Sequence, residues 1–325
     1  MSIEKKPLVN DLYTADPSAH VFNGKIYIYP SHDEDIDVEN NDNGDQYDMK
    51  DYHVYEMPDT ETYPRDCGCV LKLEDIPWAS KQLWAPDCVE KDGKYYFVFP
   101  ARDKEGFFRI GIAIGDKPEG PFKAEPNYIP GSYSIDPCMF PDTDGKYYLT
   151  FGGIWGGQLD QYRNNKWSAD NKEPKGDEEA CTAKIALMKD NLLEMAEEPK
   201  DIMILDENGK PLTGGDEARR YFEDPWMFKK GDTYYFTYST GTTHLLCYAT
   251  SKNVYGPYTY GGVILTPVLG WTTHHSILEF NGKWYLFYHD CERSGGVNQK
   301  RNVKFRELKF NDDGSIQTMD GSLDK

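Results

Sequence analysis

The sequence of 325 residues lacks any long hydrophobic run. A membrane-spanning helix needs ~18 or more consecutive apolar residues, and no stretch approaches that length. The first ten residues, MSIEKKPLVN, also lack the apolar centre of a secretory signal peptide. We therefore expect a cytoplasmic protein that has no membrane partner.

Basic residues and paired cysteines are scarce as well. There are 36 Lys and Arg against 55 Asp and Glu, which gives a net charge of −19. This charge disfavours a nucleic-acid partner and is compatible with a neutral substrate such as a sugar. The cysteines are odd in number, and Cys67 and Cys69 are the only close pair. Because the spacings of structural zinc sites are absent, we interpret the cysteines as reduced thiols.

Phosphate-binding motifs are also missing. The glycine-rich segment at residues 152–157 reads GGIWGG and fits neither the GxxxxGK[ST] nor the GxGxxG arrangement. We interpret it as a wall of an active site, and we expect no organic cofactor.

Aromatic strands, by contrast, are abundant. Residues 221–238 read YFEDPWMFKKGDTYYFTY, two aromatic runs separated by a turn at Gly231, which predicts a β-hairpin. The same turn and aromatic strand recur at four more glycines, Gly24, Gly93, Gly145 and Gly282.

The spacing of these hairpins predicts the fold. Successive turn glycines are 51 to 86 residues apart, which suits about four short strands per unit. Repeats of this kind are typical of propellers, in which each blade is one sheet and its first strand lines a central channel. We therefore predict an all-β, five-bladed β-propeller that uses residues 1–325 as a single catalytic domain.

Polar or aromatic groups stand eight or nine residues before each turn glycine, at the start of the leading strand. They are Asp16, Trp84, Asp136, Glu223 and His274. Asp-Pro and Glu-Asp-Pro are common in turns, so one such carboxylate alone would be structural. Three at equal offsets in converging strands indicate a functional trio instead.

Carboxylates placed in this way can hydrolyse a glycosidic bond. One acts as the acid and another as the base or nucleophile, while a third raises the pKa of the acid. Metal binding by all three is a weaker alternative, because no second cluster of oxygen ligands accompanies them.

The chain resembles glycoside hydrolase family 43. The resemblance runs from about Pro7 to Phe310 and is carried by ADPSAHVFNGKIYIY at the start, WAPD at 84–87, SIDPCMF at 134–140, FED at 222–224 and THHS at 273–276. It implies a five-bladed propeller that hydrolyses xylosides and arabinofuranosides.

The resemblance also implies roles for the three acids. Asp16 would be the general base, Asp136 the pKa modulator and Glu223 the general acid of an inverting reaction. Inversion needs room for a water molecule, so we expect the Asp16 and Glu223 carboxyl groups to lie ~6.5–9.5 Å apart.

Four further site residues follow from the same resemblance. His274 would face a calcium ion or its waters, and Arg301 would contact the sugar; the alternatives are a core histidine and a surface arginine. Trp84 and Trp155 would stack on sugar faces, or else pack between blades. His275 makes the register at His274 ambiguous, and its side chain should lie on the opposite face of the strand.

These observations favour an exo-acting β-xylosidase with possible α-L-arabinofuranosidase activity, acting on small oligosaccharides. The insertions at residues 30–80 and 152–220 are long enough to close a pocket. An endo-arabinanase of the same family, with an open cleft, and a non-catalytic sugar-binding propeller are the alternatives. An invertase-type propeller is disfavoured, because Asn10-Asp11 lacks the following Pro-Asn and Asp224, not Cys, follows Glu223. The sequence does not decide between xylose and arabinose, and it does not indicate an oligomeric state.

Overall fold

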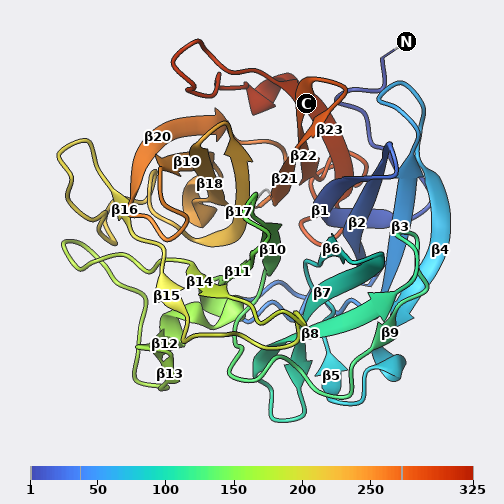
Figure 1. Ribbon diagram of the computed structural model, residues 1–325, viewed down its shortest axis with the longest axis horizontal. Helices are drawn as coiled ribbons and strands as arrows, with labels where there is room; N and C mark the ends of the chain where they lie inside the picture. The colour runs from blue at the N-terminus through green and yellow to red at the C-terminus, as the bar shows by residue number, and fades with distance from the viewer. Residues whose placement is uncertain (1, 37, 272–273, 325) are drawn as a thin grey trace.

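The computed structural model describes residues 2–36, 38–271 and 274–324. Its strands form five sheets arranged around a central axis (Figure 1), which confirms the all-β, five-bladed propeller. The helices of the described residues are short 3₁₀ segments, η1 (Leu73–Asp75), η2 (Trp155–Gly157), η3 (Leu159–Gln161), η4 (Gly241–Thr243) and η5 (Gly321–Asp324). None of the described helices has the length and apolar character needed to cross a membrane.

Blades I to III come from the first two thirds of the chain. Blade I contains β1 (Tyr13–Phe22), β2 (Lys25–Asp33), β3 (Asp51–Met57) and β4 (Arg65–Lys72). Blade II contains β5 (Ala79–Lys81), β6 (Asp87–Lys91), β7 (Lys94–Asp103), β8 (Phe108–Gly115) and β9 (Lys123–Ala124). Blade III contains β10 (Cys138–Pro141), β11 (Tyr147–Phe151), β14 (Lys184–Leu187) and β15 (Lys200–Asp201).

Blades IV and V complete the ring. Blade IV contains β16 (Ile204–Leu205), β17 (Glu223–Lys230), β18 (Thr233–Ser239), β19 (Leu246–Ser251) and β20 (Tyr258–Leu265). Blade V contains β21 (His275–Phe280), β22 (Lys283–Asp290) and β23 (Asn302–Leu308). A separate hairpin of β12 (Tyr162–Arg163) and β13 (Lys166–Trp167) lies in the connection within blade III.

All five predicted hairpins are present, and in each the first strand is the leading strand of a blade. The β1–β2 turn places Asn23 at φ +52° and Gly24 at φ +74°. The β21–β22 turn does the same with Asn281 at φ +51° and Gly282 at φ +77°. Two successive positive φ values belong to the type I′ turn, whose twist matches that of the flanking strands. Asn-Gly therefore sets the register of these blades.

The insertion at residues 158–220 contributes strands to two blades. It supplies β14 and β15 of blade III, and then β16, which pairs in parallel with β20 of blade IV. The insertion therefore connects two blades rather than interrupting the repeat. Because β15 and β16 have two residues each, they are too short to show an alternating pattern.

The ring closes where the N-terminal segment meets blade V. The backbone N–H groups of Lys5, Leu8 and Thr14 donate to the carbonyl groups of Phe305, Val303 and Arg301, at 3.0, 2.9 and 3.1 Å. The side chains of Ile3, Leu8 and Val9 are buried in one cluster with residues of β1, β2, β21, β22 and β23. The start of the chain thus adds an outer layer to the last blade.

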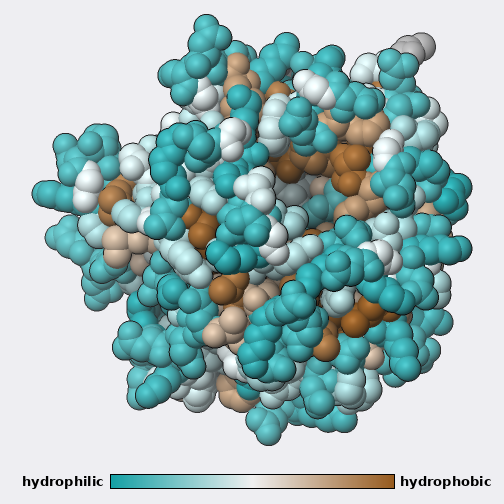
Figure 2. Space-filling model, viewed as in Figure 1, coloured by the Kyte–Doolittle hydropathy of each residue, from teal (hydrophilic) through white to brown (hydrophobic). Residues whose placement is uncertain are grey.

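Buried polar contacts also join the inner strands. The Asp87 carboxylate accepts hydrogen bonds from the Ser18 hydroxyl, the His20 ring (2.6 Å) and the backbone N–H of Met139 (2.6 Å). Asp87 therefore links blades I, II and III and has a structural role. Figure 2 shows that the face viewed is largely hydrophilic, with hydrophobic residues visible mainly near its centre, in keeping with the excess of acidic residues.

Candidate active site

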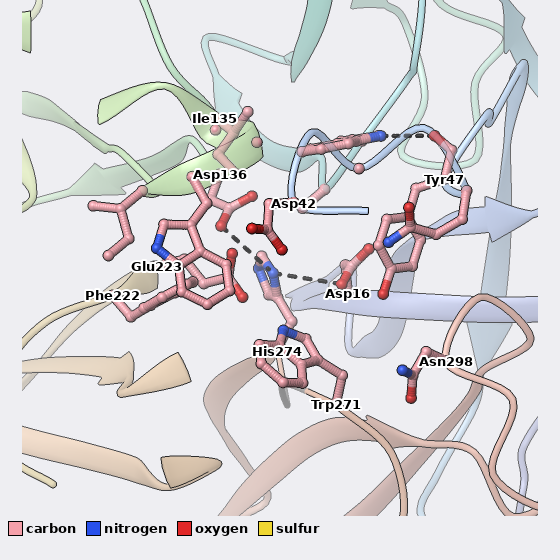
Figure 3. Close-up of a pocket in the computed structure, with 18 of the residues that line it drawn as sticks. Asp16, Asp42, Tyr47, Ile135, Asp136, Phe222, Glu223, Trp271, His274 and Asn298 are labelled. Atoms are coloured by element: carbon pink, nitrogen blue, oxygen red, sulfur yellow. Dashed lines mark hydrogen bonds and ion pairs between the residues drawn. The ribbon is translucent and has the colours of Figure 1, made fainter. Parts of the chain in front are cut away.

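The leading ends of the five blades line one cavity with a volume of about 300 Å³. The structure brings together in its lining all seven residues singled out in the sequence, Asp16, Trp84, Asp136, Trp155, Glu223, His274 and Arg301. Figure 3 shows His274 between Asp16 and Asp136, with Glu223 on the Asp136 side. Thr273, part of the THHS motif, lies outside the described residues.

Asp-Pro dipeptides shape the backbone at three of these ends. Asp16, Asp136 and Asp224 have φ values of +51°, +55° and +63°, and a proline follows each. Asp tolerates the left-handed region better than most residues, because its short side chain bonds locally. The ladder is shifted after Ala15 in β1 and after Glu223 in β17, which re-aims side chains toward the axis.

In blade IV the residue that lines the cavity precedes the Asp-Pro dipeptide instead of belonging to it, a difference that the sequence did not show. Glu223, one residue before the Asp-Pro, lines the cavity, whereas Asp224 is buried outside its lining. One Asp224 oxygen lies 2.8 Å from His274 Nε2, and the other accepts hydrogen bonds from the His275 backbone N–H (2.9 Å) and ring. Asp224 therefore holds the two neighbouring histidines. Its Asp-Pro dipeptide, shared with Asp16 and Asp136, was the available signal.

Asp16 lies among hydrogen-bond donors and positive charge. Arg301 Nη1 donates to Asp16 Oδ1 at 2.9 Å, and the Ser31 hydroxyl donates to Oδ2. Burial alone would raise the pKa of Asp16, but Arg301, His274, His289 and Ser31 outweigh it and lower the pKa to about 2. Asp16 is therefore ionised at neutral pH and can accept a proton.

Arg301 is held in place by a buried partner that sequence reasoning missed. Asp33, the last residue of β2, accepts from Arg301 Nε (2.8 Å), Nη2 (2.7 Å) and backbone N (2.9 Å). Such a two-pronged contact fixes the plane of the guanidinium group. The Arg301 guanidinium also lies 4.8 Å from the centre of the Tyr47 ring. Arg301 is thus a buried residue of the site, not a surface arginine.

Asp136 has the opposite electrostatic environment from Asp16. Burial and the neighbouring charges of Glu223 and Asp16 raise its pKa well above the usual value, although the backbone N–H of Asp224 donates to it at 3.0 Å. Like charges that share a buried site cannot all ionise, so the Asp136 carboxyl group retains a proton more readily than an exposed one. The site therefore combines an ionised carboxylate with a carboxyl group that can donate.

His274 lies at the centre of the acidic groups. Its Nδ1 is 3.5 Å from Asp16 Oδ1 and 3.9 Å from Asp136 Oδ2. Burial lowers its pKa to about 4, so the ring is neutral at pH 7. A neutral ring that donates from Nε2 to Asp224 keeps its lone pair on Nδ1, facing the other two carboxylates.

This arrangement fits a hard cation only in part. One ring nitrogen and two carboxylate oxygens face the same space, whereas Ca²⁺ takes six to eight ligands that are mainly oxygen. Water would have to supply the remainder. A more closely spaced group of candidate metal ligands lies in blade I, away from the cavity.

His275, the neighbour that made the register ambiguous, does not line the cavity. Its ring is buried and lies 2.6 Å from the Thr237 hydroxyl, on β18. His274 is thus the histidine of the pair that faces the site.

The two predicted tryptophans both line the cavity. Trp84 donates from its indole N–H to the Tyr47 carbonyl at 2.8 Å, and Gly44 lies so close that a Cβ there would be 2.5 Å from the ring. Trp155 donates to Glu173 at 2.9 Å and contacts Trp271 at 6.0 Å between ring centres. Trp271, which also lines the cavity, was not singled out in the sequence.

Two loops close the blade II side of the cavity by direct contact. Arg102 Nη2 donates to the carbonyl groups of Asn43, at 3.1 Å, and Gly156, at 3.2 Å. A Cβ on Gly156 would lie 3.0 Å from the Asn43 carbonyl oxygen, so the approach requires glycine. The segment GGIWGG is therefore a wall of the cavity, as the sequence predicts.

Comparisons with known proteins agree with this geometry. A sequence model described as Glycosyl hydrolases family 43 matches residues 5–316. The chain is 57% identical over 322 residues to a xylosidase/arabinosidase of Bacteroides ovatus, with 99% of each chain covered. It is 58% identical to xylosidase/arabinosidase 43A of Humicola insolens, over 96% of this chain and 98% of that one.

A solved structure extends the likeness to three dimensions. CoXyl43, a family 43 β-xylosidase/α-arabinofuranosidase from a compost microbial metagenome, was solved with xylotriose in a calcium-free form. It superposes with a TM-score of 0.96 at 55% identity and covers 99% of this chain and 98% of its own. The fold, the cavity and these matches over nearly the whole chain show that it belongs to glycosyl hydrolase family 43.

Proposed function

We propose that this glycoside hydrolase is an exo-acting β-xylosidase that also accepts α-L-arabinofuranosides and releases terminal pentose from short oligosaccharides. The observation that carries the proposal is the electrostatic contrast between Asp16 and Asp136 in one cavity. The relatives named for both activities, and the xylotriose bound by CoXyl43, support this substrate class.

In the proposed reaction each of the three acidic residues has one role. Asp16, kept ionised beside Arg301, takes a proton from the attacking water, and Glu223 protonates the departing oxygen. Asp136 lies beside Glu223, and repulsion between the two carboxylates favours retention of one proton, which Glu223 delivers to the leaving group. The reaction then inverts the anomeric centre in one displacement.

The closed wall favours exo action over endo action. The contact of Asn43 with Gly156, bridged by Arg102, blocks the cavity on the blade II side, so a polymer cannot run straight across it. A cavity of about 300 Å³ is also at the small end for ligand pockets. We expect the terminal sugar to stack between Trp84 and Trp155, with Arg301 holding a hydroxyl.

We also propose a calcium ion held through water at His274, near Asp16 and Asp136. When bound, the ion would supply positive charge that offsets the repulsion among these acids. We expect Ca²⁺ to raise the melting temperature of the wild type and EDTA to lower it, with both effects lost in His274→Ala. An equal calcium response in wild type and His274→Ala would remove this part of the proposal.

Nitrophenyl sugars and xylobiose together test the assigned roles. Nitrophenolate leaves with little help from an acid, so Glu223→Gln should retain far more activity on nitrophenyl β-xyloside than on xylobiose. Asp16→Asn should lose roughly 10²-fold or more on both substrates. Activity of Asp16→Asn close to that of the wild type would contradict the assignment of the base. No hydrolysis of any pentoside by the wild type would overturn the proposed function.

A further inference from the structure

A second group of chemically active side chains lies in blade I, outside the cavity lining. His32 is on β2, and Asp51 and His53 are on the neighbouring β3. One possible ligand atom from each lies within 4.8 Å of the other two. Among the residues that the structure describes, this is the one place where three His, Cys, Asp or Glu side chains come so close.

The ladder explains why these residues share one face. Asp51 and His53 are two positions apart on β3, so their side chains point to the same side of the sheet. His32 Nδ1 lies 2.6 Å from Asp51 Oδ1, and the His32 and His53 rings meet edge to face with centres 5.6 Å apart. The three side chains therefore converge from two adjacent strands.

A fourth residue orients the group from the next strand. His53 Nδ1 lies 3.1 Å from Asp66 Oδ2 on β4. A carboxylate that accepts a hydrogen bond from a histidine ring fixes its tautomer and orientation, as carboxylates do beside the histidine ligands of metal sites. The side chains of His32, Asp51 and His53 are 15%, 26% and 17% exposed, so an ion can enter from solvent.

We propose that His32, Asp51 and His53 bind a divalent transition-metal ion such as Zn²⁺, in a site separate from His274. Two imidazole nitrogens and one carboxylate oxygen are a common zinc ligand set, with water at the fourth position. Calcium is disfavoured here, because it requires six to eight ligands that are mainly oxygen. The bound ion cross-links β2 and β3, and it stabilises blade I without entering the cavity.

Isothermal titration with ZnCl₂, in buffer free of chelators, tests this site. His274→Ala serves as the parent chain, so that the cavity histidine contributes nothing. We expect one zinc per chain, binding at least ten-fold weaker after His53→Gln or Asp51→Asn is added, and roughly ten-fold weaker after Asp66→Asn. Circular dichroism of each variant verifies the fold, and zinc should raise the melting temperature of the parent more than that of these three variants.

The neighbouring thiols of β4 provide the control. Cys67→Ser/Cys69→Ser should bind zinc as the parent does. Loss of binding in that variant, with binding unchanged in His53→Gln, would overturn the proposal in favour of the thiols. Equal affinity in all variants, or no binding by the parent, would overturn it as well. Anomalous scattering at the zinc edge from crystals of the wild type should place the ion between His32, Asp51 and His53.

Discussion

Asp136 tests the electrostatics of the site at the scale of one residue. Asp136 and Glu223 repel each other when both are ionised, so Asp136→Asn should lower the pKa of the acid. We expect the alkaline limb of the kcat/KM profile to move to lower pH and kcat to fall roughly 10²-fold or more. Rates on nitrophenyl xyloside between pH 4 and 9 measure both effects. An alkaline limb that stays in place would contradict the modulator role.

Arg301 carries a second prediction at this scale. Arg301→Lys loses the two-pronged contact with Asp33 and cannot also reach Asp16 in the same geometry. We expect kcat/KM to fall roughly ten- to hundred-fold, since a hydrogen bond to a charged group contributes about 1.5–3 kcal/mol.

The pH profile separates this electrostatic effect from a simple loss of binding. With less positive charge nearby, the pKa of Asp16 should rise from about 2, and the acid limb should move to higher pH. Lys283→Met, on the exposed face of blade V, is the matched control and should change neither quantity. An unchanged acid limb in Arg301→Lys would show that Arg301 does not set the ionisation of Asp16.

At the scale of residues, site residues at repeated positions could be predicted from the sequence, whereas their buried hydrogen-bond partners could not. Asp16, Asp136 and Glu223 were recognisable because each lies eight or nine residues before a turn glycine. Asp33 holds Arg301 but occupies no repeated position. Asp224 shares its Asp-Pro dipeptide with Asp16 and Asp136, but that dipeptide does not show that Asp224 holds His274. Such partners depend on strand register and on bulges, which composition and spacing do not fix.

The loop at Gly156 gives a prediction at the scale of an element. Gly156→Ala forces a Cβ against the Asn43 carbonyl, 3.0 Å away, and should displace the two loops that close the cavity. We expect KM for xylobiose to rise several-fold while kcat changes less, because the acids themselves are not moved.

Gly209→Ala is the control for this substitution. Gly209 has φ +76° in an exposed turn with open space around it, so alanine there adds backbone strain without any collision. It should lower the melting temperature slightly and leave KM unchanged. Equal KM values for Gly156→Ala and wild type would show that the contact does not shape the sugar site.

The elements themselves were predictable to different degrees. The five leading hairpins follow from aromatic strands and glycine turns, four of them Asn-Gly or Asp-Gly, whose geometry is local. The two-residue strand β15 was not predictable, because its place depends on the edge of blade III. The tendency of a residue to occupy a strand depends more on packing against neighbouring strands than on an intrinsic backbone preference of that residue.

Ring closure gives a prediction for the whole molecule. Ile3, Leu8 and Val9 are each at most 4% exposed and lie between blades I and V. Burial of one such side chain contributes about 1.5–3 kcal/mol, and a cavity left by truncation adds to the loss. We expect Leu8→Ala to lower the free energy of unfolding by about 2–4 kcal/mol, measured by urea denaturation, and to leave kcat at 25 °C unchanged.

An exposed valine controls for this truncation. Val21→Ala, at a side chain that is 37% exposed, should have a much smaller effect. Equal losses for Leu8→Ala and Val21→Ala would mean that the N-terminal segment does not secure the ring.

The ring brings Asp16, Asp136 and Glu223 to one cavity, where we propose that Asp16 acts as the base and Glu223 as the acid. The most direct test is proton NMR of the xylose first released from xylobiose, recorded before the anomers equilibrate. A water activated by Asp16 on the face opposite the leaving group yields α-xylose first. First release of β-xylose would contradict the account, because it would require a covalent intermediate and a nucleophile in place of the base.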